Sequence, residues 1–85
     1  NNLHIQKGIQ LYPNPASEKV TIDFIDNATS VKVYNMLGKL VFENNIKEGI
    51  HKISIEVKSL KADVYNVQLY NQNEVIANKM FNKVR

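Results

Sequence analysis

Cysteine is absent from this sequence, which excludes disulfide bonds and thiolate metal sites as sources of stability. The three glycines, Gly8, Gly38 and Gly49, stand far apart, so there is no glycine-rich loop of the kind that cradles a phosphate. No apolar run approaches the roughly 18 residues of a membrane-spanning helix, and no signal-peptide core is found. We therefore expect no direct membrane insertion and a fold that depends on its hydrophobic core.

The size and charge of the chain indicate one ordinary folded domain. Its 85 residues suffice for a single domain, and 44% of them are hydrophobic and 22% charged. The net charge of +3 is mild, and most of the lysines are interleaved with acidic residues, which is typical of a solvated surface. We therefore expect no nucleic-acid partner. Because the sequence starts with Asn1 rather than methionine, we also expect it to be a piece of a longer polypeptide.

Apolar and polar residues alternate with a period of two along much of the chain, which predicts half-buried β-strands. No segment has the 3.6-residue period of a helix. Turn-forming residues separate the alternating segments at spacings near ten residues, a rhythm that favours an antiparallel sandwich or barrel with all-β structure. The expected strands cover residues 9–12, 19–24, 31–34, 39–43, 51–57, 65–70 and 75–81.

The segment 59–70, Ser-Leu-Lys-Ala-Asp-Val-Tyr-Asn-Val-Gln-Leu-Tyr, predicts a tight corner followed by a strand. We expect Leu60 to enter the core while the chain turns before Asp63, a residue type that tolerates positive φ. Tyr65 follows the corner at the start of a late strand. Its hydroxyl either bonds upstream backbone, as in the tyrosine corner of immunoglobulin-like folds, or stays hydrated at the edge of the core.

No group of residues in the sequence indicates catalysis or a cofactor or metal site. His4 and His51 have no second ligand at a metal-binding spacing, and the acidic residues are dispersed along the strands. We expect Asp23 and Glu56 to form cross-strand pairs with lysines instead. The tyrosines Tyr12, Tyr34 and Tyr70 are candidates for a stacking platform, although tyrosine also simply favours strands. We expect a non-enzymatic module without a cofactor.

Several segments together resemble a known family. Residues 11–17, Leu-Tyr-Pro-Asn-Pro-Ala-Ser, and residues 31–41, Val-Lys-Val-Tyr-Asn-Met-Leu-Gly-Lys-Leu-Val, resemble the opening and the central hairpin of the type A C-terminal sorting domain of the type IX (Por) secretion system of Bacteroidota. Residues 49–55 fit its next strand, and residues 59–67 resemble its Leu-x-x-Gly-x-Tyr segment. Residues 79–85 look like its basic final strand. Asp63 stands where the family usually has glycine, so we expect a strained left-handed residue there.

The resemblance implies a seven-stranded immunoglobulin-like sandwich over residues 10–85, preceded by a linker over residues 1–9. It implies a non-catalytic signal that the type IX translocon reads, covalently preceded by an N-terminal cargo domain. The cargo would pass through the periplasm to the cell surface or the medium, and a sortase-like peptidase would usually remove the signal. The recognition residues carried over by motif are Pro13, Asn14, Pro15, Gly38, Lys79, Lys83 and Arg85, and the structural corner consists of Leu60, Asp63 and Tyr65.

A second hypothesis is an immunoglobulin-like accessory module that binds polysaccharide or another protein. It predicts measurable affinity in the isolated domain and a dependence on Tyr34 or Tyr70. The sorting hypothesis instead predicts a position at the extreme C-terminus of a precursor, after a removable linker.

Overall fold

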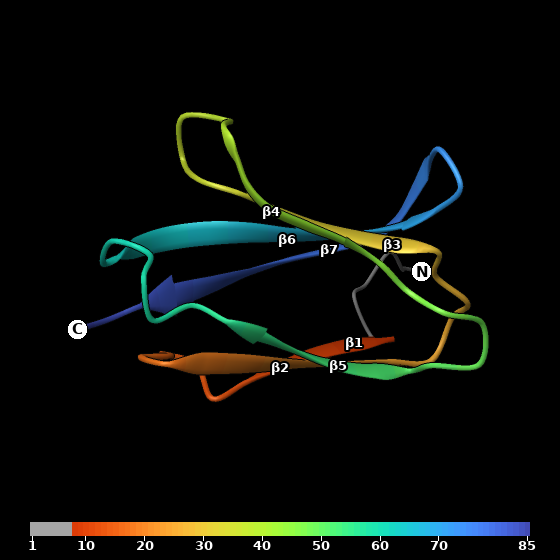
Figure 1. Cartoon of the computed structure of the whole chain (residues 1–85), viewed down its shortest axis with the longest axis horizontal. Coiled ribbons are helices and arrows are strands. Elements are labelled where there is room, and N and C mark those ends of the chain that lie inside the picture. The colour runs from red at the N-terminus through yellow and green to blue at the C-terminus, as the bar shows by residue number, and fades with distance from the viewer. Residues whose placement is uncertain (1–7) are drawn as a thin grey trace, which may run out of the picture.

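Seven β-strands in two antiparallel sheets form the described part of the chain, residues 8–85 of a computed structural model (Figure 1). Each strand overlaps one of the seven predicted segments, so the all-β prediction is confirmed. The strands are β1 (Ile9–Tyr12), β2 (Lys19–Phe24), β3 (Ser30–Tyr34), β4 (Leu40–Asn45), β5 (Lys52–Glu56), β6 (Asp63–Asn71) and β7 (Glu74–Lys83).

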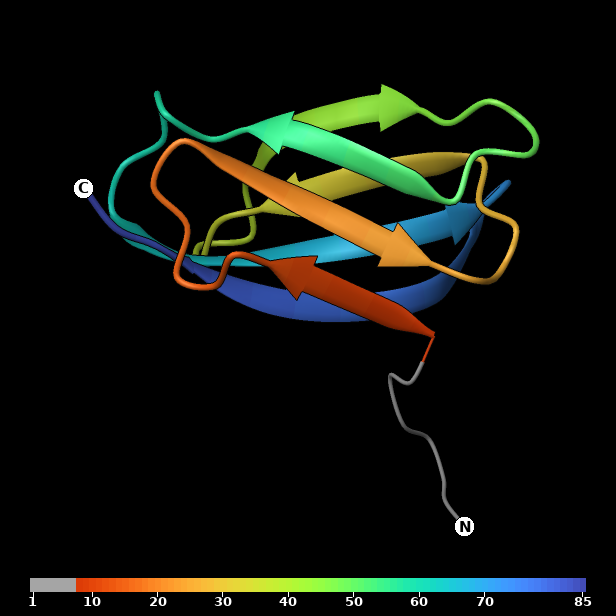
Figure 2. The ribbon, with the colours of Figure 1, turned by 90° about the horizontal axis from the view of Figure 1, so that it is seen from below.

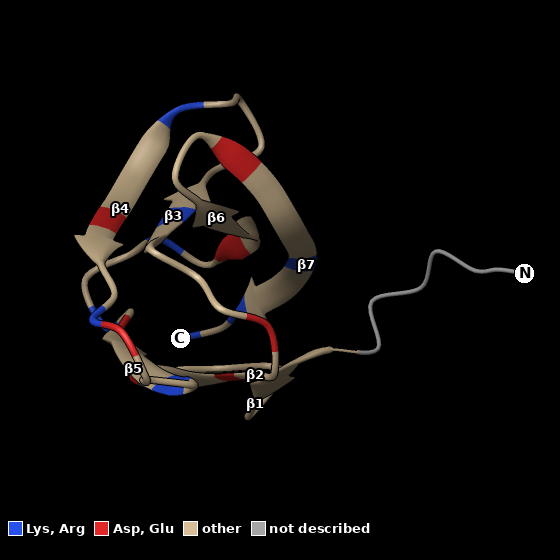
Figure 3. Ribbon diagram, turned by 90° about the vertical axis from the view of Figure 1, so that its right-hand side faces the viewer, with Lys and Arg blue, Asp and Glu red and all other residues tan. Residues whose placement is uncertain are grey.

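The two sheets face each other as a sandwich. One sheet has the order β1-β2-β5 and the other the order β4-β3-β6-β7. Viewed almost along the strands, they lie as two layers with the core between them (Figure 3). The alternation seen in the sequence puts every second side chain into that core. The buried hydrophobic residues are Ile9, Leu11, Ala16, Val20, Ile22, Phe24, Ala28, Val31, Val33, Ile46, Ile55, Val57, Tyr65, Val67, Leu69 and Phe81.

The strand β4 departs from regular alternation, and the register explains why. Val33 pairs with Phe42 while Tyr34 pairs with Leu40, so one extra residue, Val41, is inserted in β4. Such a bulge shifts the side-chain pattern by one position. Val41 and Phe42 are therefore both half-buried, which accounts for the continuous apolar run in the sequence.

Residues of opposite charge lie opposite each other on β2 and β5, in the register that cross-strand pairs need. Lys19 lies opposite Glu56, and Asp23 lies opposite Lys52. These side chains share the outer face of the three-stranded sheet, where opposite charges contribute only a few tenths of a kcal/mol.

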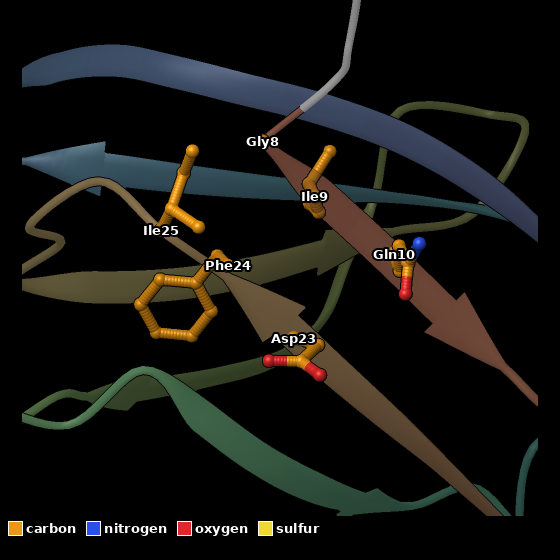
Figure 4. A pocket seen from close by; sticks show the side chains of 6 residues that line it. All are labelled: Gly8, Ile9, Gln10, Asp23, Phe24 and Ile25. Atoms are coloured by element: carbon orange, nitrogen blue, oxygen red, sulfur yellow. The ribbon is translucent and has the colours of Figure 1, made fainter.

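The chain enters the sandwich at Gly8. The backbone N–H of Ile25 donates to the Gly8 carbonyl at 3.0 Å, and a Cβ added at Gly8 would lie 3.1 Å from the Ile25 Cγ1 atom. Both residues line a shallow pocket beside the start of β1 (Figure 4). Ile9 is buried and belongs to β1, whereas residues 1–7 of the predicted linker lie outside the described residues. This entry lies at the opposite end of the sandwich from the C-terminus (Figure 2).

Candidate functional site

Three segments meet around the end of β7, and we name this region the C-terminal corner: residues 13–18, 58–65 and 81–85. Tyr65 lies at its centre and is 4% exposed. Its hydroxyl donates to the Lys61 carbonyl oxygen at 2.7 Å, so the predicted tyrosine-corner hydrogen bond is confirmed. The Tyr65 ring stacks on Phe81 with 5.6 Å between the ring centroids. Burial raises the pKa of the Tyr65 phenol, and the charge of Asp63 raises it further.

The prediction of a left-handed Asp63 is wrong. Within residues 8–85, Gln72 is the non-glycine residue with positive φ, at 57°. Asp63 is already extended as the first residue of β6 and pairs with Lys83, so the turn is completed before it. Its Oδ1 atom accepts a hydrogen bond from the backbone N–H of Val64 at 2.8 Å. The corner therefore does not need glycine at this position for backbone freedom.

Asn14 of the Pro-Asn-Pro segment and Ala16 just after it are held against the end of β7 and Val84 by three hydrogen bonds. The backbone N–H of Asn82 donates to Asn14 Oδ1 at 2.9 Å. The N–H of Ala16 donates to the Asn82 carbonyl, and the N–H of Val84 donates to the Ala16 carbonyl, both at 2.8 Å. Both X–Pro peptide bonds, Tyr12–Pro13 and Asn14–Pro15, are cis. The segment therefore serves as a clamp that joins the first sheet to the last strand.

Lys83 contributes to the interior of this corner rather than to its surface. The residue is 6% exposed, and its Nζ atom donates to the Leu60 carbonyl oxygen at 3.1 Å. Lysine is rarely this buried unless it has a partner. Sequence reasoning placed Lys83 among the recognition residues. Alternation from Phe81 would have put Lys83 on the inward face, but the expected strand ended at residue 81.

The other two predicted recognition residues lie elsewhere. Lys79 is half-buried on β7, opposite Val67 and on the inward face of the sheet. Gly38 lies in the β3–β4 turn with a φ of 84°. In that turn Asn35 Oδ1 accepts hydrogen bonds from the N–H groups of Leu37 and Lys39, both at 2.9 Å. The structure thus brings Pro13, Asn14, Pro15, Lys83 and Arg85 together and leaves Gly38 and Lys79 outside this corner.

The β3–β4 turn carries a feature that sequence reasoning missed. Met36 is 58% exposed and Leu37 is 93% exposed, although both are apolar. The hydrogen bonds to Asn35 hold these side chains on a defined turn. Their place in a predicted loop between two strands was the signal that could have identified them.

The predicted tyrosine platform does not form as one surface. Tyr12 lies on β1 in the three-stranded sheet, whereas Tyr34 and Tyr70 lie on the other sheet. The Lys32 ammonium lies 4.8 Å from the centroid of the Tyr70 ring, so one face of that ring is covered. A side-chain hydrogen bond with Tyr34, together with burial, raises the pKa of the Tyr70 phenol.

The described residues hold no arrangement typical of metal chemistry. Across residues 8–85 no cluster of histidine, aspartate and glutamate side chains could hold a metal ion. The His51 ring lies 5.7 Å from that of Phe24, and His4 lies outside the described residues. No helix in the described part of the chain has the length and hydrophobicity that a membrane span needs.

Comparison with known proteins agrees with this geometry. The family model for the secretion system C-terminal sorting domain matches residues 10–83. The chain belongs to this family. The matched region runs from the second residue of β1 to the last residue of β7, so it includes all seven strands except for Ile9. The search of curated proteins found no match to this chain.

A solved structure supports the fold of the sorting domain. A DUF3244 family protein from Bacteroides vulgatus, described as having an immunoglobulin-like β-sandwich fold, superposes with a TM-score of 0.73. The match covers 91% of this chain and 85% of that chain at 20% sequence identity. The predicted immunoglobulin-like sandwich is therefore confirmed.

Family membership assigns the chain a role as a type IX secretion sorting signal. It also implies a secreted or cell-surface protein and an association with the type IX secretion machinery.

Proposed function

We propose that this domain is a non-catalytic signal that directs a preceding cargo protein across the outer membrane through the type IX translocon. In this proposal a sortase-like peptidase then removes the domain, and the cargo remains on the cell surface or is released. The cleaved region lies in or next to residues 1–9. The observation that carries the proposal is the family match over residues 10–83, which spans both sheets and the clamp between them.

The arrangement of the two ends supports this proposal. The chain enters at Gly8, and the β1–β2 loop and the end of β7, which carry the predicted recognition residues of the C-terminal corner, lie at the opposite end of the long axis (Figure 2). A cargo joined before Gly8 would therefore leave the C-terminal corner accessible to a receptor. The edge strand β7 also carries Lys79 and Lys83 on its inward face, and inward-pointing charges limit uncontrolled pairing at a sheet edge.

The decisive test is export of a neutral reporter protein fused ahead of Asn1. The fusion is expressed in a host that has the type IX machinery and in a host that lacks it. We expect the reporter at the surface, without the domain, in the first host alone. Periplasmic retention of a folded fusion in both hosts would contradict the proposal and would direct attention to glycan and protein binding.

The structure also determines which variant can test recognition. Deleting residues 78–85 removes Phe81, which is 1% exposed and stacked on Tyr65, so that deletion would unfold the domain and not test recognition alone. A point variant at an exposed residue, Arg85→Glu, avoids this problem. Lys47→Glu is the matched control, because Lys47 is also exposed but lies between β4 and β5. Recognition at the C-terminal corner predicts reduced export for Arg85→Glu alone.

A further inference from the structure

Half of the residues that line a hollow in the C-terminal corner are cationic. The volume of this hollow is about 510 Å³, and we name it the basic hollow. Three separate parts of the chain contribute to it: the β1–β2 loop, the β5–β6 loop and the end of β7. The lining residues are Ser17, Glu18, Lys58, Leu60, Lys61, Ala62, Lys83 and Arg85.

Positive charge is concentrated at this hollow. Among residues 8–85, four of the ten Lys and Arg residues line it, but only one of the eight acidic residues does. The other residues in this range hold six cations and seven acids, which nearly cancel. Charged residues of both signs are spread over the two sheets (Figure 3). Asp63 follows Ala62 and adds one negative charge nearby, but the positive charge around the basic hollow still exceeds the negative charge. Such an excess attracts anionic partners.

Backbone hydrogen bonds fix the rim of the basic hollow. The N–H of Val57 donates to the Glu18 carbonyl at 2.8 Å, and the N–H of Leu60 donates to the Val57 carbonyl at 3.0 Å. The Tyr65 hydroxyl holds the Lys61 carbonyl, as described above. The backbone that carries Lys58 and Lys61 is thus positioned before any partner binds, which reduces the entropy lost on association.

We propose that the basic hollow binds an acidic segment of a partner protein. Lys58, Lys61 and Arg85 are exposed and pair with its carboxylates, and Arg85 can do so through two parallel hydrogen bonds. Lys83 is a positioning residue, because its buried ammonium holds the Leu60 carbonyl and thereby the loop that carries Lys61.

The contacts favour a peptide over a free phosphate or another small anion. A small anion needs donors that converge on one point. The Lys83 ammonium lies deepest among the cations and is already bonded to the Leu60 carbonyl. The remaining cations are exposed, and Leu60 and Ala62 add apolar surface next to them. An acidic segment fits this mixture, since its carboxylates reach the cations while its carbon atoms contact Leu60.

This inference deepens the proposed function and rests on it for one point, that the partner is a component of the secretion machinery. The chemistry of the basic hollow does not depend on that point. A binding experiment outside the cell therefore separates the two: binding without export contradicts the proposed function, and export without binding contradicts this inference.

The experiment titrates the 85-residue chain with a synthetic peptide of alternating glutamate and alanine and follows the backbone amide signals by NMR. We expect shifts centred on Lys58, Lys61 and Arg85. Lys58→Glu combined with Lys61→Glu should weaken binding by at least about tenfold. The control, Lys39→Glu combined with Lys47→Glu, changes the net charge equally at exposed sites outside the hollow and should have an effect of about twofold or less.

Three results would overturn the assignment. The first is equal weakening by the control pair, which would indicate attraction by net charge alone. The second is inorganic phosphate producing the same shifts at the same concentration, which would make the hollow a small-anion site. The third is tighter binding of an anionic polysaccharide than of the peptide. If the double variant Lys58→Glu, Lys61→Glu does not fold, the double variant Lys58→Gln, Lys61→Gln removes the same two cations. An unchanged affinity of this second variant for the peptide would also contradict the proposal.

Discussion

Removing the Tyr65 hydroxyl tests the C-terminal corner most directly. Tyr65→Phe keeps the ring and its stacking on Phe81 but removes the 2.7 Å hydrogen bond to the Lys61 carbonyl. A hydrogen bond of this kind contributes about 0.5–1.5 kcal/mol net. Lys61 is an exposed residue and the hydrogen bond is only partly buried, so we expect water to reach its carbonyl and the larger cost of an unpaired buried carbonyl not to apply. We expect the free energy of unfolding to fall by about 1 kcal/mol.

Urea denaturation near neutral pH, followed by circular dichroism, measures this loss. For a domain of this size about 1 kcal/mol also lowers the melting temperature by roughly 4–8 °C. Tyr12→Phe is the control, because the Tyr12 hydroxyl lies 3.4 Å from Asp23 on an exposed face. Its effect should stay within about 0.5 kcal/mol. Equal losses in the two variants, or none in Tyr65→Phe, would refute the reasoning.

The pH dependence of the same variant gives an independent check. Burial raises the pKa of Tyr65, so the folded chain holds this proton more tightly than the unfolded chain, in which the pKa is about 10. The stability from this effect is full below about pH 10 and is lost as the pH rises through the folded pKa. Tyr65→Phe lacks this loss, so the stability difference from the wild type should narrow above about pH 10. Tyr70 also has a raised pKa, but it is present in both proteins and cancels.

Three further substitutions test other parts of the fold by urea denaturation. Phe81→Ala removes a side chain that is 1% exposed and should cost about 3–5 kcal/mol; a loss below about 1 kcal/mol would contradict its place in the core. Asn14→Ala removes the acceptor for the Asn82 N–H and should cost about 0.5–1.5 kcal/mol, whereas Asn73→Ala in an exposed turn should be neutral. Gly38→Ala should lower the free energy of unfolding by about 1–2 kcal/mol, because alanine is strained at a φ of 84°. A Cβ at this position would meet no atom within 4 Å, so backbone strain and not a clash is the source of the cost.

The sequence by itself determined the strands and their faces. Alternation is a local property, because successive side chains of a strand point to opposite faces whatever the strand pairs with. The inward residues Val20, Ile22 and Phe24 could therefore be named without knowing the partner strand, and all three are buried. The ordered motifs from residue 11 to residue 85 also sufficed to indicate the family, which the family match confirms.

The bulge in β4 marks the limit of that local reasoning. The run Leu40-Val41-Phe42 predicted two partly covered faces, but the cause is the register of β4 against β3. Register depends on where two strands pair, and a single strand does not contain it. The same limit applies to Asp63, whose extended backbone follows from its pairing with Lys83 rather than from its own turn propensity.

The tertiary structure alone decided which residues form the C-terminal corner. Asn14 and Asn82 are 68 residues apart and meet because β1 and β7 are neighbouring edges of the two sheets. Lys83 lies beyond the strand that the sequence predicts, at residues 75–81, yet the corner buries it and pairs it with the Leu60 carbonyl. Lys58 and Lys61 line one hollow with Arg85 only because the β5–β6 loop folds beside the end of the chain that carries Arg85. Contacts of this kind depend on how the sheets pack, whereas the alternation that builds each strand depends only on its own residues.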